Sequence, residues 1–332
     1  MKLWKKLLVL SSVSIFSVGM LAGCGEQTAG TTTNGKSYNI GIVQLVEHNA
    51  LDAASRGFVD GMKDRGYEEG KNVTYDRQNA QADQSNLQNI ATRFVNNNND
   101  LILAIATPSA QSVANATKEI PIVGTAITDY VGAKLVESNE KPGGNVTGTS
   151  DMNPIPQQID LLQQLVPNAK TIGVIYTSSE VNSEVQVKAM TEYAESKGLT
   201  VKVATISTVN DIQQAAQSLV GDVDVFYEPT DNVIASAMPT LAAVTDAAKK
   251  PIICGEENMV RAGGLATYGI DYYKLGVQTG EMGADILDGK SKPADMAIQT
   301  AKELKLTINK TNAEALGVTI PEDLMKDAEV VE

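Results

Sequence analysis

The sequence predicts an α/β protein with two lobes, each built on a doubly wound parallel sheet, and a ligand cleft between the lobes. Short apolar runs alternate with segments of helical spacing along most of the chain, which is typical of parallel sheets covered by helices. The alternation restarts after the Gly/Pro-rich stretch at residues 141–144. With 332 residues, the chain also exceeds the size at which a single hydrophobic core keeps growing.

In the first half of the chain, each expected strand is a short apolar run, and each expected helix has its apolar residues three or four positions apart. The expected strands are Tyr38–Val43, Val73–Gln78, Leu101–Ala106 and Ile120–Thr125. The expected helices are Asp52–Arg65, Ser85–Asn96 and Ala110–Thr117. Since strand and helix alternate, we expect these strands to run parallel.

The second half of the chain repeats this pattern. The expected strands are Thr171–Tyr176, Thr200–Ala204, Val223–Tyr227 and Ile252–Cys254. The expected helices are Pro156–Leu165, Val181–Lys197, Val209–Leu219 and Val233–Lys249. The halves also share short motifs: Ile40–Val43 resembles Ile172–Ile175, and Gly143–Asp151 resembles Gly263–Asp271. The sequence therefore predicts two lobes that are copies of one unit.

The N-terminal segment predicts export and lipid anchoring. Lys2, Lys5 and Lys6 precede an uncharged apolar run, and the run ends in Leu21-Ala22-Gly23-Cys24, which resembles a bacterial lipobox. We expect residues 1–23 to be a signal peptide, Cys24 to be lipidated, and residues 24–37 to be a flexible tether. The protein would then lie on the outer face of the bacterial cytoplasmic membrane. The alternative is an ordinary signal peptide with a chance cysteine.

Composition excludes several classes of function. The chain has 27 Lys+Arg against 40 Asp+Glu, a net charge of −13, which excludes nucleic acid or an anionic membrane surface as the main partner. Two cysteines cannot form a disulfide scaffold, and the single histidine, His48, argues against a metal site built from histidines. We expect no metal and no cofactor. Few arginines and no tryptophan after Trp4 disfavour phosphate-rich and sugar ligands, whereas acidic, hydroxyl and tyrosine side chains suit a molecule with one ammonium and one carboxylate group.

Candidate ligand residues are those that follow the expected strands, because ligands of parallel sheets bind at the carboxyl ends of the strands. Many of them are Ser, Thr, Asp or Asn at the start of the next helix, where they could equally serve as helix N-caps. A helix start can also bind a carboxylate. The predicted ligand-binding residues are Glu47, His48, Asn49, Thr107, Ser109, Thr125, Asp151, Tyr176, Thr230, Asp231, Asn232, Glu256, Tyr268 and Asp271.

Several segments together resemble one family. Val46–Asp52, Ala104–Gln111, Lys141–Gly148, Val225–Asn232 and Ala266–Tyr273, after the lipobox, are similar to the solute-binding lipoproteins of ABC importers, of the type associated with tryptophan and tyrosine uptake. The resemblance implies a type I periplasmic-binding-protein fold, three hinge crossings, and an ABC permease with its ATPase as partners. Of the residues above, it implies a site formed by those at 47–49, 107, 109, 151, 230–232, 256 and 271. Asn49 and Ser109 stand where such proteins commonly have Pro and Ala.

We therefore predict that this chain is no enzyme and captures an amino acid by closing two lobes over it, and we expect that amino acid to be an aromatic one. The first lobe would comprise residues 38–150 and about 273–297, and the second residues 151–272 and about 298–332. The hinge strands would lie near Thr147–Asp151, Tyr268–Tyr272 and Ile298–Leu304. The sequence leaves open a sensory lipoprotein, or a binding protein of this fold for a nucleoside or sugar. An extracellular enzyme would need a nucleophile elbow or a metal cluster, and the sequence shows neither motif.

Overall fold

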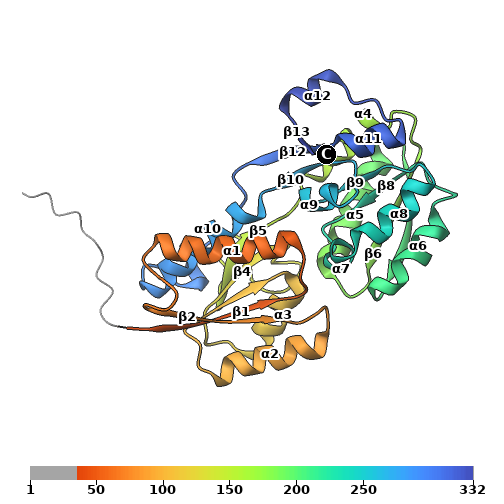
Figure 1. The fold of residues 1–332 in the computed structure, drawn as a ribbon. Helices are drawn as coiled ribbons and strands as arrows, with labels where there is room; N and C mark the ends of the chain where they lie inside the picture. Colours follow the sequence, from red (N-terminus) through yellow and green to blue (C-terminus); the bar gives the residue numbers. More distant parts are fainter. Residues whose placement is uncertain (1–35, 332) are drawn as a thin grey trace, which may run out of the picture. The chain divides into compact units, whose positions relative to one another are not determined.

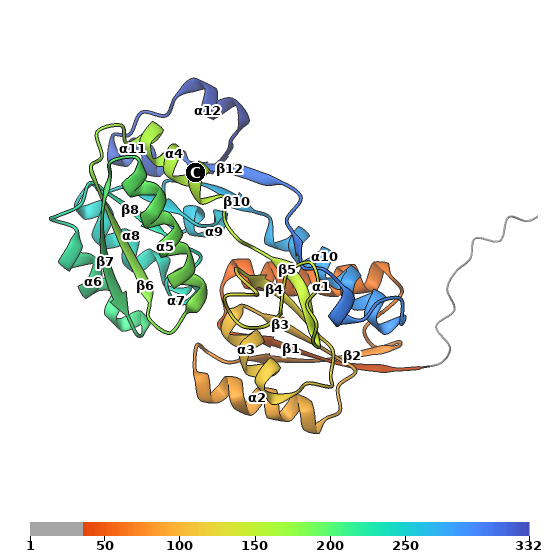
Figure 2. The same cartoon turned by 180° about the vertical axis from the view of Figure 1, so that it is seen from behind.

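The computed structural model describes residues 36–331, and the predicted signal peptide, Cys24 and most of the tether lie outside these residues. The described residues contain two sheets (Figures 1 and 2). Of the helices in this part of the chain, none has the length and apolar content needed to cross a bilayer. Within the same residues, no group of three or more His, Cys, Asp or Glu side chains is arranged to hold a metal ion.

The first sheet has the strand order β11-β5-β4-β3-β1-β2, and every pairing in it is parallel. Helices α1 and α10 cover one face, and α2 and α3 cover the other (Figure 1). The strands are β1 (Tyr38–Gln44), β2 (Val73–Asn79), β3 (Leu101–Ile105), β4 (Ile122–Ile127), β5 (Val146–Ser150) and β11 (Gln299–Thr300). The helices are α1 (Asn49–Asp64), α2 (Gln84–Asn96), α3 (Thr107–Ala116) and α10 (Tyr272–Leu287).

The second sheet has the strand order β13-β12-β10-β9-β8-β6-β7. Its strands are β6 (Thr171–Thr177), β7 (Thr200–Ile206), β8 (Val225–Glu228), β9 (Ile252–Cys254), β10 (Ala266–Ile270), β12 (Leu304–Asn309) and β13 (Glu329–Val331). Its helices are α4 (Ile155–Leu165), α5 (Val181–Ser196), α6 (Ile212–Leu219), α7 (Asn232–Ser236), α8 (Met238–Ala247), α9 (Glu257–Arg261), α11 (Lys310–Leu316) and α12 (Glu322–Asp327). Short 3-10 turns lie at Val209–Asp211 and Pro293–Asp295.

The predicted fold class, α/β with two parallel-strand sheets, is confirmed, with one exception in the second sheet. Strand β12 runs antiparallel to β10, and Ile270 pairs with Leu304. The reason lies in the path of the chain. The chain leaves the second sheet at the end of β10 and returns to it at the start of β12. The end of one strand therefore lies beside the start of the other, so the two neighbouring strands run in opposite directions.

Three short linkers connect the sheets. Residues 151–154 lead from β5 to α4, Asp271 alone separates β10 from α10, and residues 301–303 lead from β11 to β12. Strand β11 pairs with β5, so the segment that returns to the first sheet continues through Thr300. The chain therefore crosses between the lobes at three places, and each crossing has few residues in which a hinge rotation could be absorbed.

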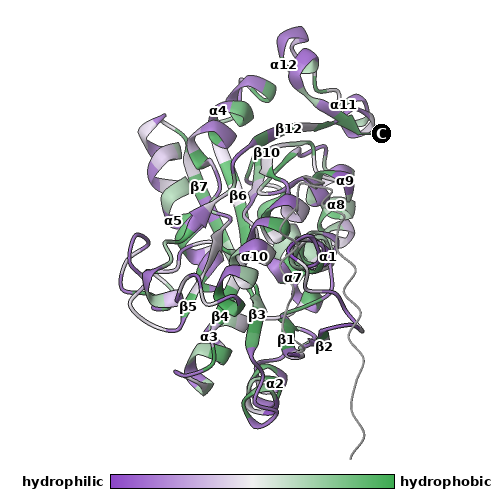
Figure 3. Cartoon of the chain, turned by 90° about the vertical axis from the view of Figure 1, so that its left-hand side faces the viewer, coloured by the Kyte–Doolittle hydropathy of each residue, from purple (hydrophilic) through white to green (hydrophobic). Residues whose placement is uncertain are grey.

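Each sheet has apolar layers on its faces. Figure 3 shows the central strands largely in hydrophobic colours and the outer helices with many hydrophilic residues. In the first lobe one buried cluster surrounds Ile42, Phe58 and Leu103. In the second lobe, the cluster around Leu162 lies under α4 and α5, and the cluster around Phe226 lies under α6, α7 and α8. Both strand faces are thus buried, which explains their continuous apolar sequences.

One predicted helix is broken in the structure. The segment Val233–Lys249 was expected to form a single helix, but α7 ends at Ser236 and α8 begins at Met238, with Ala237 at φ −132° between them. Pro239 lies in the first turn of α8. Proline has no backbone N–H to donate, and its ring clashes with the carbonyl group of the preceding helical turn, so a continuous helix cannot run through it. Proline is tolerated in the first turn of a new helix.

Glycines bring the backbones of α1 and α10 into direct contact. A Cβ added to Gly57 would lie 2.1 Å from the carbonyl oxygen of Tyr273, and one added to Gly276 would lie 2.1 Å from the carbonyl oxygen of Ala54. Both distances are far below van der Waals contact, so no larger residue fits without moving a helix. This packing fixes the two helices relative to each other, and both begin at the same edge of the first sheet.

We expect Gly276→Ala to lower the free energy of unfolding by about 1–3 kcal/mol, because its methyl group would overpack the α1–α10 contact. Without that contact, the same change inside a helix would raise stability by about 1 kcal/mol. Gly221→Ala, in a turn after α6, is the control for a methyl group added in open space, since a Cβ at Gly221 meets no atom within 4 Å. Urea unfolding measures both variants, and equal stability of the two would contradict the close packing.

Candidate functional site

A small cavity lies where the carboxyl ends of strands from both sheets meet. It encloses only about 10 Å³, which is room for about one water molecule. The lining residues come from the end of β4, from the segments that follow β1, β4, β5, β6, β8 and β9, and from the start of α10. They are His48, Ala50, Leu51, Ala126, Thr128, Asp151, Asn182, Thr230, Asp231, Asn232, Ala235, Glu256 and Tyr272.

Asp151 is the acid of the first interlobe linker and is buried at 3% exposure. Its Oδ1 accepts a hydrogen bond from Thr128 Oγ1 at 3.1 Å, and its Oδ2 accepts one from the hydroxyl of Tyr272 at 2.7 Å. Burial raises the pKa of this carboxyl, although the two hydroxyl donors act in the opposite direction. The Tyr272 contact joins the first linker to the helix that follows the second linker.

Asp231 is the acid at the start of α7, and its carboxylate accepts four hydrogen bonds from neutral donors. Its Oδ1 accepts from Ile234 N at 3.0 Å and from Thr177 Oγ1 at 2.8 Å. Its Oδ2 accepts from Thr177 N at 2.7 Å and from Ser183 Oγ at 2.8 Å. Asp231 is fully buried, and burial raises its pKa. It is therefore both the N-cap of α7 and a wall of the cavity.

Glu256 has the same double position at the start of α9. Its Oε1 accepts from Met259 N at 2.8 Å, and its Oε2 accepts from Asn258 N at 2.7 Å. Burial raises the pKa of Glu256 to about 7. The cavity is thus lined by three acids and by no lysine or arginine. Since buried charges normally require a compensating partner, this wall favours a ligand that carries a positive group.

The start of α3 presents free hydrogen-bond donors. Ala106 precedes the helix at φ +77° and provides no side-chain cap. The hydroxyls of Thr107 and Ser109, exposed by 1% and 0%, have no hydrogen-bond partner. Ala106 N donates to Thr125 O at 3.1 Å, which places this helix start against β4, beside the cavity wall at Ala126. An uncapped helix start with two unpaired hydroxyls suits a carboxylate.

The two lobes also touch each other through side chains at the cleft. His48 Nε2 lies 3.3 Å from Asn232 Oδ1, and Gln186 Nε2 donates to Thr128 Oγ1 at 3.4 Å. His48 and Thr128 belong to the first lobe, and their partners belong to the second. Burial lowers the pKa of His48, although its contact with Asn232 and the charge of Asp52 act in the opposite direction.

The structure brings some predicted residues together and leaves others outside the cavity. His48, Asp151, Thr230, Asp231, Asn232 and Glu256 line it. Glu47 and Asn49 flank His48 but are exposed. Thr107 and Ser109 lie buried at the start of α3 and do not line the cavity.

Three further predicted residues lie inside strands and do not line the cavity. Thr125 lies within β4 and accepts a hydrogen bond from Thr149 Oγ1 at 3.2 Å. Tyr176 in β6 and Tyr268 in β10 pack against the core under α4 and α5. Asp271 instead caps α10 by accepting a hydrogen bond from Lys274 N at 3.0 Å.

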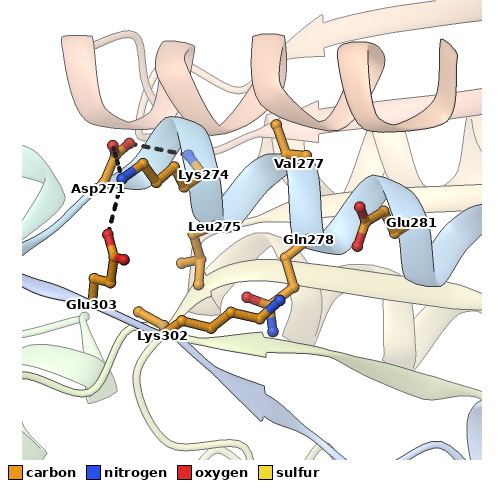
Figure 4. A pocket seen from close by; sticks show the side chains of 9 residues that line it. Asp271, Lys274, Leu275, Val277, Gln278, Glu281, Lys302 and Glu303 are labelled. Carbon is orange, nitrogen blue, oxygen red and sulfur yellow. Dashed lines mark hydrogen bonds and ion pairs between the residues drawn. The ribbon is translucent and has the colours of Figure 1, made fainter. Parts of the chain in front are cut away.

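Asp271 also borders a second pocket, of about 290 Å³, beside the linkers (Figure 4). There Lys274 forms ion pairs with Asp271 at 3.9 Å and with Glu303 at 3.1 Å. Asp271 and Glu303, two of the three carboxylates that line this pocket, thus share a cation partner, unlike the acids of the cleft. The linker acid that the structure leaves without a cation is Asp151.

Sequence reasoning did not select Thr128, Asn182 or Tyr272 as site residues, and it also missed Glu180, which lies behind Asn232. Thr128 directly follows β4. Asn182 and Glu180 follow β6, just beyond the residues considered there. A search extended to the first turn of each following helix would have included all four.

The comparisons agree with this geometry. The family described as ABC transporter substrate binding protein matches residues 39–332. The chain belongs to this family. Its members are binding proteins and not enzymes, so the expectation that this chain is no enzyme is confirmed, and so is the family resemblance.

Two relatives are described with an aromatic amino acid. A tyrosine-binding protein of Clostridioides difficile (strain R20291) is 47% identical over 321 residues, which cover 95% of this chain and 93% of that protein. A structure from Streptococcus pneumonia, described as an ABC domain in complex with L-Trp, is 43% identical with a TM-score of 0.87, and the match covers 90% of this chain and 100% of that one.

A third relative differs in conformation. The ligand-free, open structure of a substrate-binding protein with adhesive properties from Clostridium difficile is 46% identical but has a TM-score of only 0.69, covering 89% of this chain and 99% of that one. Identity and coverage are nearly equal for the two structures, so sequence divergence does not account for the lower score. The conformation of residues 36–331 is therefore closer to that of the L-Trp complex, in keeping with the small size of the cavity.

Proposed function

We propose that this protein is an extracytoplasmic solute-binding lipoprotein that captures an aromatic amino acid and delivers it to an ABC permease and its ATPase. The observation that carries the proposal is the cavity wall of three buried acids without a lysine or arginine, in a chain whose relatives are described with tyrosine and L-Trp. An amino acid brings the missing positive charge in its ammonium group.

Asp151 is the proposed partner of the ligand's ammonium group. Its two carboxylate oxygens already accept hydroxyl donors from Thr128 and Tyr272, which hold the carboxylate in place without neutralising it. An ammonium group placed there would form charge-assisted hydrogen bonds, which are about twice as strong as neutral ones. It would also favour the ionised form of Asp151, whose pKa burial has raised.

The start of α3 is the proposed site for the ligand's carboxylate. The hydroxyls of Thr107 and Ser109 supply donors, and the helix dipole favours negative charge at this end. The two ends of a zwitterion would then be held by different segments, the carboxylate by the first lobe and the ammonium by an interlobe linker. Since the cavity holds about one water molecule, the lobes must part to admit the ligand and then close over it.

Calorimetric titration of the purified protein with L-tryptophan, L-tyrosine and L-phenylalanine tests this proposal. We expect at least one of them to bind, and indole-3-propionate, which lacks the ammonium group, to bind at least tenfold more weakly than L-tryptophan. Asp151→Asn should weaken amino acid binding by about 1.5–3 kcal/mol, or roughly ten- to a hundredfold in Kd. Sugars and nucleosides in the same panel should give no heat of binding.

The matched control for that variant is Asp129→Asn. Asp129 accepts a hydrogen bond from Gly132 N at 2.9 Å, which an asparagine oxygen can also accept, and it does not line the cavity. Its affinity should equal that of the wild type. Equal binding of indole-3-propionate and L-tryptophan would contradict the role of the acids, and binding of only a sugar or nucleoside would overturn the proposed ligand.

Anchoring through Cys24 is a separate part of the proposal, supported by the lipobox-like Leu21-Ala22-Gly23-Cys24. We expect the wild-type protein to sediment with membranes and to carry a diacylglyceryl group on an N-terminal Cys24. Cys24→Ser should release the protein from the membrane fraction. Unchanged membrane association of Cys24→Ser, or an intact mass without lipid for the wild type, would rule out this anchor.

A further inference from the structure

Glu180 is a buried acid whose side chain turns away from its own helix. It immediately precedes α5 but makes no capping hydrogen bond to that helix. Its carboxylate instead accepts from Asn232 N at 3.1 Å, from Asn232 Nδ2 at 2.5 Å and from Val233 N at 3.1 Å. Asn182 Nδ2 donates a fourth hydrogen bond at 2.9 Å. Glu180 is 2% exposed and does not line the cavity, so it acts through its neighbours.

The contact with Asn232 fixes the direction of an amide group. Because Nδ2 of Asn232 donates to Glu180, its Oδ1 points the other way, toward His48 Nε2 at 3.3 Å. An amide oxygen can only accept, so His48 must carry its proton on Nε2. His48 belongs to the first lobe and precedes α1, whereas Asn232 and Glu180 belong to the second.

The geometry points to Glu180 as a positioning residue for a latch across the cleft: it orients the Asn232 amide so that His48 of the opposite lobe can donate to it when the lobes are closed. The chain of contacts runs Glu180–Asn232–His48. Burial and the charge of Asp231 raise the pKa of Glu180, but four N–H groups face its carboxyl, so it acts there only as an acceptor and allows one orientation of the amide. A glutamine at position 180 would offer a donor as well and would allow the amide to turn over.

This inference rests on the proposed function only in that closure serves ligand capture, and the first test does not need the ligand. His48 is the only histidine of the chain, so protein made with ¹⁵N-histidine and without a histidine tag gives the signals of one imidazole. We expect neutral His48 of the wild type to carry its proton on Nε2. In Glu180→Gln the single tautomer should be replaced by a mixture. A wild-type tautomer with the proton on Nδ1 would overturn the latch.

Glu184→Gln is the matched control, because Glu184 lies on the same helix one turn later and is exposed. Its imidazole signals should equal those of the wild type. If Glu180→Gln does not fold, Asn232→Ala removes the middle of the chain of contacts and should produce the same loss of the single tautomer. An imidazole that is unchanged in both folded variants would also overturn the latch.

A double-mutant cycle on the Kd for L-tryptophan or L-tyrosine, whichever binds, separates positioning from a general structural role. Glu180→Gln and His48→Ala should each weaken binding roughly five- to tenfold. The double variant should be no weaker than His48→Ala, because both changes break one chain of contacts. Effects that multiply would contradict the inference. If neither amino acid binds the wild type, the proposed function fails, while the imidazole spectra still decide on the latch.

Discussion

Burying a carboxylate without a cation costs free energy, and this protein does so repeatedly around one cavity. Asp151, Asp231 and Glu256 line the cavity, and Glu180 lies just behind it. Neutral donors hold each of them: hydroxyls for Asp151, the first backbone N–H groups of α9 for Glu256, backbone N–H groups and hydroxyls for Asp231, and backbone and side-chain amides for Glu180. The fold supplies these donors because both sheets direct their following helix starts to the same cleft.

The same constraint links recognition to closure. Donors from the protein can hold an acid in place, but its charge is neutralised only by a proton or by a positive group from outside, and the proposed ligand would supply that group. Asp151 lies on one linker, and its partner Tyr272 directly follows another. A charge bound at Asp151 therefore acts on the segments that must rotate when the lobes close. His48 directly precedes α1, and Tyr272 begins α10. The glycine contacts between these two helices therefore also fix the position of His48 relative to Tyr272.

Periodicity and strand ends predicted the two sheets and much of the cavity wall, because parallel strands are buried apolar runs and their carboxyl ends meet at one edge. Thr230, Asp231, Asn232 and Glu256 were found in this way. The reversed direction of β12 depends on where the chain returns from the first lobe, which no local pattern encodes. The roles of Glu180 and Asp271 depend on the direction of their side chains. Glu180 precedes α5 but accepts hydrogen bonds from the start of α7, whereas Asp271 caps α10, the helix that it precedes.

The central claim is that the ligand supplies the positive charge that the cavity acids lack. Its most direct test is the number of protons released on binding, measured by calorimetric titration of L-tryptophan, or of L-tyrosine, at pH 7 in buffers of different ionisation enthalpy. Burial has raised the pKa of Asp151, and that of Glu256 to about 7, so an arriving ammonium group should lower both and expel protons. We expect a net release of protons into the buffer. Binding with no proton release, or with proton uptake, would contradict the account.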